Sequence, residues 1–248
     1  MVQLSLTEQG RVILRSKKFY QQLTSVLIAE RCSLIKNKAF SRAHQAWKEE
    51  ELETEMGDLR KWLEQDGVGF FTKIGLKRGQ IALDFGCGAG NYAIPAAVNV
   101  GREGRVYALD KERRGFWPSE GLDKLIDRAE SRALQNITVM KTLGELKIEL
   151  EDDSVDVVLL YDVLHYYYFP SKEDRMKLLR EIQRVLKPNG FISFYPGDPE
   201  VSRNYSELET IKREIEEANF QRESEYIGTV IHENVIQKGR VVKFRRVE

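Results

Sequence analysis

Residues 82–91 read Ala-Leu-Asp-Phe-Gly-Cys-Gly-Ala-Gly-Asn, and this stretch decides the fold. A short apolar segment reaches an acid, Asp84, and is followed by glycines at alternate positions, Gly86, Gly88 and Gly90. Because glycine has no Cβ, such a turn can adopt positive φ values and lets backbone amides approach a ligand. A helix predicted to begin just after the third glycine would direct its free N–H groups at the same point. The stretch therefore predicts a strand, a ligand-binding turn and a helix.

Two other nucleotide-binding turns are excluded by the positions of these glycines. The dinucleotide fingerprint Gly-x-Gly-x-x-Gly needs Gly or Ala five residues after Gly86, where Asn91 stands. That fingerprint also places a pyrophosphate at the turn, whereas Asp84 suits a positively charged group. A Walker A loop needs Gly-Lys-Ser/Thr, which is absent from this stretch. The alternative left open is a glycine-rich turn that binds nothing.

The composition sets outer limits on the kind of protein. A chain of 248 residues can form one sizeable α/β domain with an appendage, and 42% hydrophobic content is ordinary for a globular protein. No apolar run approaches the roughly 18 residues of a membrane span, and no signal-peptide pattern opens the chain. The two cysteines, Cys32 and Cys87, form no disulfide framework, so we expect a cytoplasmic protein.

The N-terminal part of the chain has a helical pattern. Apolar residues recur at near-helical spacing, without strand-like alternation, and a helix expected from about Ser41 ends before Gly67. We predict that residues 1–75 form a helical extension or lid near the mouth of the main domain. The alternative is that this extension only stabilises the protein.

From Gln80 onward, short apolar strands alternate with helical spans, as in a parallel sheet covered on both faces. Five strands are predicted at residues 81–85, 105–110, 137–141, 155–161 and 191–195. Ser171 is predicted to cap a helix that ends before Pro188. Two further strands, around residues 223–232 and 240–247, are joined through Gly239. Their connection is short, so they form an antiparallel pair.

The acid-x-Gly-x-Gly-x-Gly turn and the final antiparallel hairpin resemble the class I S-adenosylmethionine (SAM)-dependent methyltransferases. The resemblance covers residues 76–248. It implies an α/β fold with a doubly wound, mostly parallel seven-stranded sheet of order 3-2-1-4-5-7-6, whose last hairpin is antiparallel. It also implies a SAM-dependent methyltransferase (EC 2.1.1.-) with SAM as its cofactor. The three histidines lack the spacing of metal ligands, so we expect no metal site.

The resemblance also assigns contacts to the cofactor, because ligands of such sheets bind at the carboxyl ends of the strands. In the family, the acid that closes the second strand accepts the ribose hydroxyls, and Asp110 holds that position here. Leu143 replaces the usual acid that holds the adenine amine, so backbone groups near Thr142 and Leu143 are expected to substitute, with Glu145 as an alternative. The full expected set is Asp84, Phe85, Gly86, Cys87, Gly88, Gly90, Asp110, Lys111, Thr142, Leu143 and Tyr161.

The fourth strand is followed by Asp162, Val163, Leu164 and His165. The Leu-His pair resembles the small-molecule and C-methyltransferase branch, which includes enzymes of ubiquinone and menaquinone biosynthesis. An imidazole with a pKa of ~6.5 can take a proton from an acceptor as it is methylated. His165 is therefore the predicted general base, with Asp162 as an acceptor contact. The alternative is a structural histidine beneath the tyrosines that follow it.

The acceptor is predicted to be a small molecule, with two alternatives. Residues 1–48 carry nine Lys/Arg against two acids, so they could engage RNA phosphates or an acidic protein surface. A methyltransferase-like partner subunit without activity is the second alternative, because Leu143 departs from the family pattern.

Overall fold

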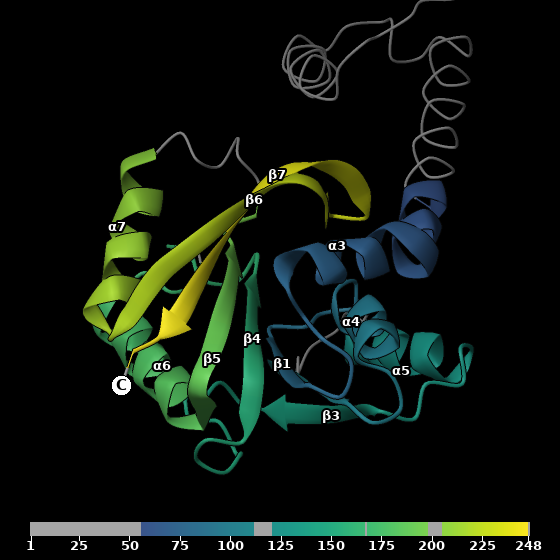
Figure 1. The fold of residues 1–248 in the computed structure, drawn as a ribbon, viewed down its shortest axis with the longest axis horizontal. Helices are drawn as coiled ribbons and strands as arrows, with labels where there is room; N and C mark the ends of the chain where they lie inside the picture. Colours follow the sequence, from purple (N-terminus) through teal and green to yellow (C-terminus); the bar gives the residue numbers. More distant parts are fainter. Residues whose placement is uncertain (1–55, 112–120, 167, 198–204, 248) are drawn as a thin grey trace, which may run out of the picture. The chain divides into compact units, whose positions relative to one another are not determined.

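The computed structural model describes residues 56–111, 121–166, 168–197 and 205–247 (Figure 1). The predicted N-terminal extension lies outside the described residues as far as position 55. None of the described helices is long and apolar enough to cross a lipid bilayer.

Within the described residues, seven strands form one sheet of order β3-β2-β1-β4-β5-β7-β6. Strands β1 to β5 are parallel, and β7 is antiparallel to both β5 and β6. This order confirms the predicted fold class. The strands are β1 (Ile81–Phe85), β2 (Arg105–Lys111), β3 (Ile137–Thr142), β4 (Val155–Tyr161), β5 (Leu186–Tyr195), β6 (Phe220–His232) and β7 (Val235–Arg246).

Helices cover both faces of the sheet because side chains alternate along each strand. Ala82 faces a core that includes residues of α3 (Gly67–Ile74), α4 (Ala93–Val100) and α5 (Leu122–Glu130). Leu83 faces a core that includes residues of α6 (Lys172–Val185) and α7 (Tyr205–Glu217). The Ser171 hydroxyl accepts a hydrogen bond from the Asp174 N–H, so the predicted cap of α6 is confirmed.

The register of the parallel strands gathers three acids at one edge of the sheet. Asp84 pairs with Ala108 of β2 and Leu159 of β4. Asp110 lies two positions beyond Ala108, and Asp162 follows the last residue of β4. The three carboxylates therefore belong to the carboxyl edge, where the ligands of open α/β sheets bind.

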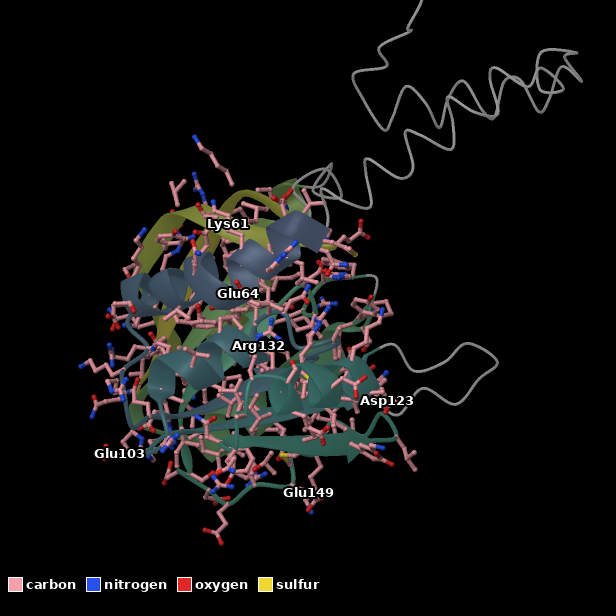
Figure 2. The ribbon with its side chains drawn as sticks, turned by 90° about the vertical axis from the view of Figure 1, so that its right-hand side faces the viewer. Lys61, Glu64, Glu103, Asp123, Arg132 and Glu149 are labelled. Carbon is pink, nitrogen blue, oxygen red and sulfur yellow. The ribbon has the colours of Figure 1, made fainter. Side chains whose placement is uncertain are left out.

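The helix before the sheet is longer than the sequence predicts. It does not end before Gly67 but continues from η2 (Trp62–Asp66) into α3, and it stops at Gly75, whose φ is 91°. A Cβ on Gly67 would lie 2.8 Å from Pro95 Cβ, so glycine lets the helix pack closely on α4. On the same side, Glu64 and Arg132 face each other at 4.0 Å (Figure 2).

The turn between β6 and β7 also corrects a prediction. Gly239 does not join the strands, because it pairs with Gly228 inside the hairpin. Glu233 and Asn234 form the turn, with φ values of 46° and 66°. Two consecutive positive φ values suit the twist of a two-residue hairpin. Glycine is needed at 239 for close packing, since a Cβ there would lie 2.4 Å from Val230 Cγ2.

Candidate cofactor and acceptor site

The glycine turn after β1 uses each of its glycines differently. Gly86, Gly88 and Gly90 have φ values of 79°, 50° and 80°. A Cβ on Gly86 would lie 2.7 Å from Val163 Cγ2, and one on Gly90 would lie 2.9 Å from Leu125 Cγ. A Cβ on Gly88 would meet no atom of the described residues within 4 Å. The outer glycines therefore allow close packing, while the middle one leaves open space at the carboxyl edge.

Backbone hydrogen bonds hold this turn against the end of β2. The N–H groups of Gly86 and Cys87 donate to the Leu109 carbonyl at 2.8 and 3.1 Å. The Gly88 N–H donates to Asp110 Oδ2 at 2.6 Å, and the Lys111 N–H donates to Asp110 Oδ1 at 2.6 Å. The structure thus brings Asp110 to the glycine turn, with the exposed Lys111 beside it.

Asp84 is a buried carboxylate with an unused oxygen. Its side chain accepts a hydrogen bond from the Ala93 N–H, but Oδ2 is buried without a hydrogen-bond partner among the described residues. Burial, together with the charge of Asp110, raises the pKa of Asp84 from 3.8 to about 7. A buried acceptor of this kind is costly unless it is paired. The site therefore fits a ligand that brings a positively charged hydrogen-bond donor.

The loop after β3 differs from the family pattern and closes on itself. Leu143 is 62% exposed, and its N–H donates to Glu145 Oε2 at 3.0 Å. The Thr142 hydroxyl donates to the same oxygen at 3.0 Å, and it accepts from the Gly144 N–H at 3.1 Å. Hydrogen bonds from its own N–H, from Thr142 and from Leu143 hold the pKa of Glu145 below its ordinary value. The Leu143 N–H, one of the backbone groups expected to serve adenine, is thus engaged within the loop.

Three of the predicted cofactor residues are buried in the cores. Phe85 and Cys87 are each 7% exposed, on opposite faces of the sheet. The Tyr161 hydroxyl lies 2.6 Å from Ser193 Oγ, and its ring lies 4.3 Å from that of Tyr92. Burial raises the pKa of Tyr161 well above its ordinary value. These side chains pack in the hydrophobic cores and thereby support the carboxyl edge of the sheet.

Arg128 and Trp62 brace the glycine turn, and sequence reasoning missed both. Arg128 Nη1 donates to the Ala89 carbonyl at 2.5 Å and to Asn91 Oδ1 at 2.9 Å. Burial, followed by the charge of Arg132, lowers the pKa of Arg128. The Trp62 indole donates to the Asn91 carbonyl at 2.7 Å. No sequence signal announces these contacts, because they join residues between 29 and 39 positions apart.

A second cluster forms where β4 ends. Asp162 has a φ of 54°, and its N–H donates to the Tyr195 carbonyl at 2.9 Å. Its Oδ2 lies 3.0 Å from His232 Nε2, and its Oδ1 lies 3.7 Å from His165 Nε2. Burial lowers the pKa of His165, and the nearby Asp162 opposes that shift. In the part of the chain that the structure describes, no group of three or more His, Cys, Asp or Glu residues is arranged to hold a metal ion.

Comparisons with known proteins agree with this geometry. Residues 83–194 match the family of methyltransferase domains. A demethylmenaquinone methyltransferase of Lactobacillus johnsonii is 32% identical over 121 residues, which are 49% of this chain and 45% of that protein. The 2-phytyl-1,4-naphtoquinone methyltransferase of Trichormus variabilis is 30% identical over 115 residues, which are 46% of this chain and 45% of that protein. The chain thus spans about half the length of these curated relatives.

Solved structures share the fold at lower sequence identity. A SAM-dependent methyltransferase from Aquifex aeolicus superposes with a TM-score of 0.56 at 23% identity, covering 75% of this chain and 93% of that one. A SAM-dependent methyltransferase from Methanosarcina mazei gives a TM-score of 0.50 at 17% identity, covering 71% of this chain and 97% of that one. The resemblance to class I methyltransferases is confirmed. The domain match indicates a methyltransferase domain, and these structures show its fold.

Proposed function

We propose that the protein is a SAM-dependent methyltransferase that acts on a small-molecule acceptor, in the cytoplasm. The observation that carries this proposal is the buried Oδ2 of Asp84, which has no partner among the described residues and lies beside the open glycine turn. A pyrophosphate would be repelled by this carboxylate, whereas the ammonium and sulfonium groups of SAM are cationic. The match to methyltransferase domains gives independent support.

The residues of the edge divide the work of holding SAM. Asp84 would accept from its ammonium group, and Asp110 would accept from its ribose hydroxyls. The Gly88 position leaves room for the ligand to approach the backbone. When bound, SAM supplies a methyl group already activated on a positive sulfur. The protein then needs to hold the acceptor in line, exclude water and, for some acceptors, remove a proton.

A quinone-like aromatic ring is the acceptor class that we propose. The curated relatives described above are named for naphthoquinone substrates, and their similarity reaches 32% identity. Asp162 and His165 follow β4 at the carboxyl edge, and β4 pairs with β1, which leads into the glycine turn. They are our candidates for acceptor contact, and the two imidazoles beside Asp162, those of His165 and His232, are our candidates for proton transfer. We also propose that residues 1–75 form a helical extension or lid.

Calorimetric titration with SAM and S-adenosylhomocysteine tests the proposal directly. We expect both ligands to bind the full chain, and Asp84→Asn to weaken both. Asp123→Asn, the same substitution at an exposed position of α5, serves as the matched control and should bind like the parent. Absence of binding by the folded parent would overturn the assignment.

Transfer of label from SAM tests the acceptor. The probe is 1,4-naphthohydroquinone, kept reduced by dithionite, with fractionated cell extract assayed in parallel. We expect label in the small-molecule fraction. Label in protein or RNA would replace the small-molecule acceptor with a macromolecule, and binding without transfer into any fraction would indicate a partner subunit.

A further inference from the structure

The β6–β7 hairpin projects past the sheet as an arm. The last rung that β7 shares with β5 joins Val242 to Phe194, and the rungs from Tyr226–Val241 to His232–Val235 join β6 and β7 only to each other. We call residues 226–241 the hairpin arm. Figure 1 shows it curving from β5 towards the side of α3, and the ring of Tyr226 lies 5.4 Å from that of Phe70.

Hydrogen bonds fix the tip of the arm to the start of α4. The Tyr92 hydroxyl donates to the Ile231 carbonyl at 2.7 Å and accepts from the Ile231 N–H at 3.3 Å. Asn91 Nδ2 donates to Asn234 Oδ1 at 3.2 Å. Asn91 and Tyr92 directly follow the glycine turn. The arm therefore carries its next residue, His232, to the carboxyl edge beside the cofactor site.

Two contacts position Asp162, the residue whose carboxylate lies beside His232. The Asp162 N–H is bonded to the end of β5, and its backbone is left-handed, a conformation that is costly for residues other than glycine and clusters at functional sites. A Cβ on Gly197 would lie 2.0 Å from Asp162 Oδ1, so the carboxylate lies directly over a glycine. The absence of a side chain at position 197 therefore leaves the space that the Asp162 carboxylate occupies.

The two histidines beside this carboxylate differ in geometry. At 3.0 Å, His232 Nε2 lies within hydrogen-bond distance of Oδ2, whereas His165 Nε2 is 3.7 Å from Oδ1. The His165 ring is also hydrogen-bonded to the Asp162 backbone, and it lies 4.8 Å from the Tyr168 ring. A neutral His232 that donates from Nε2 has its lone pair on Nδ1. Carboxylate, imidazole and substrate form the same chain in hydrolytic triads.

We propose that His232, oriented by Asp162, takes the proton of the methyl acceptor, and that His165 is a positioning residue for Asp162. This inference rests on the proposed function. The acceptor would carry an acidic hydroxyl, as in a phenol or hydroquinone. As the acceptor atom bonds to the methyl carbon, the carbon–sulfur bond breaks and its electron pair stays on sulfur. The acceptor proton passes to Nδ1 of His232, and Asp162 balances the resulting imidazolium.

Titration of the imidazoles by NMR tests this arrangement without any acceptor. The chain has three histidines, so His165→Gln and His232→Gln assign the signals. Among the described residues, the titratable groups near the cluster include Asp162, His165, His232 and Tyr168, whose ring lies 4.8 Å from that of His165. The Tyr92 hydroxyl, whose pKa is raised chiefly by burial, also lies near Asp162. In Asp162→Asn we expect the titration midpoint of His232 to fall by about one pH unit or more, because the opposite charge is lost. An unchanged midpoint would overturn the proposal.

Transfer assays with 1,4-naphthohydroquinone provide the second readout. We expect His232→Gln to lower the rate about 100-fold and to remove the acidic limb of its pH profile, with SAM affinity retained. His165→Gln should have a smaller effect, and Lys238→Gln, at an exposed position of the same arm, is the matched control. Parent-like transfer by His232→Gln would overturn the inference. If the parent binds SAM but labels no naphthohydroquinone, the acceptor class fails, and the NMR titration alone decides the role of His232.

Discussion

The glycine turn and the Asp162 cluster lie at the same edge of the sheet but are built in different ways. The turn follows directly on Asp84 and Phe85 of β1 and reaches Gly90, and its shape comes from positive φ values and hydrogen bonds to the neighbouring strand. The cluster joins residues from the end of β4, the end of β5 and the hairpin arm. Local backbone geometry therefore makes the first site, whereas the placement of a distant arm makes the second.

The largest expected effect tests how tightly the turn is packed. Gly90→Ala should lower the free energy of unfolding by about 2–5 kcal/mol, because it adds left-handed strain and a close contact with Leu125. Gly88→Ala should cost only about 1 kcal/mol, since its Cβ meets no atom in the part of the chain that the structure describes. Urea unfolding of both variants measures the difference. Equal losses would mean that backbone strain alone, and not packing, shapes the turn.

The second prediction tests the cluster in the same way. Gly197→Ala should reduce methyl transfer about 100-fold, because the new Cβ displaces the Asp162 carboxylate, and small displacements of catalytic geometry are costly. SAM affinity should remain close to that of the parent. Gly79→Ala is the control, because Gly79 also has a positive φ (78°), but its Cβ would have no neighbour within 4 Å among the described residues. Equal transfer by both variants would separate Gly197 from the cluster.

The third prediction concerns the cost of keeping Asp84 ready for a cation. Asp84→Asn should weaken SAM binding by about 10- to 100-fold, the range for losing one charge-assisted hydrogen bond. Without SAM, the Asp84→Asn variant should nevertheless have a larger free energy of unfolding than the parent at pH 8. Calorimetry and urea unfolding give the two numbers, and a variant that loses both affinity and stability at pH 8 would contradict this account.

The sign of that stability change follows from the pKa of Asp84. The folded protein holds the proton up to pH about 7, whereas the unfolded chain releases it near the ordinary value of 3.8. The stabilisation from this group is therefore present below pH 4 and is lost as the pH rises to 7, a loss on the order of 4 kcal/mol. The gain from Asp84→Asn should shrink between pH 8 and pH 5.

The smallest expected effect comes from the brace behind the turn. Arg128→Gln should weaken SAM binding about fivefold, because it removes two hydrogen bonds that hold residues 89 and 91. Methyl transfer at saturating SAM should stay near that of the parent. Calorimetry measures the affinity, and an unchanged value would show that the turn keeps its shape without the brace.

The cofactor half could be predicted because its signals are local. Acid and glycine spacing, together with short apolar strands, indicated the turn and the parallel sheet, whereas the strand order and the role expected of Asp110 were implied by the family resemblance. The second half depends on pairings that the sequence does not announce. Gly239 suggested a turn, but its lack of a side chain serves close packing, and Asn234 forms the turn instead. That shift lengthens β7, which begins at Val235 and not near residue 240.

Tyr92 follows the glycine turn by two residues, and its single hydroxyl both gives a hydrogen bond to and receives one from Ile231 of the arm. The hydrogen bonds between Tyr92 and Ile231 therefore link the glycine turn to the hairpin arm. By reciprocity, a nucleoside that orders the turn favours the seated arm by the same free energy with which the seated arm favours the nucleoside. Synergistic binding, in which the methyl donor and the acceptor each tighten the binding of the other by the same factor, is the behaviour that such a link produces.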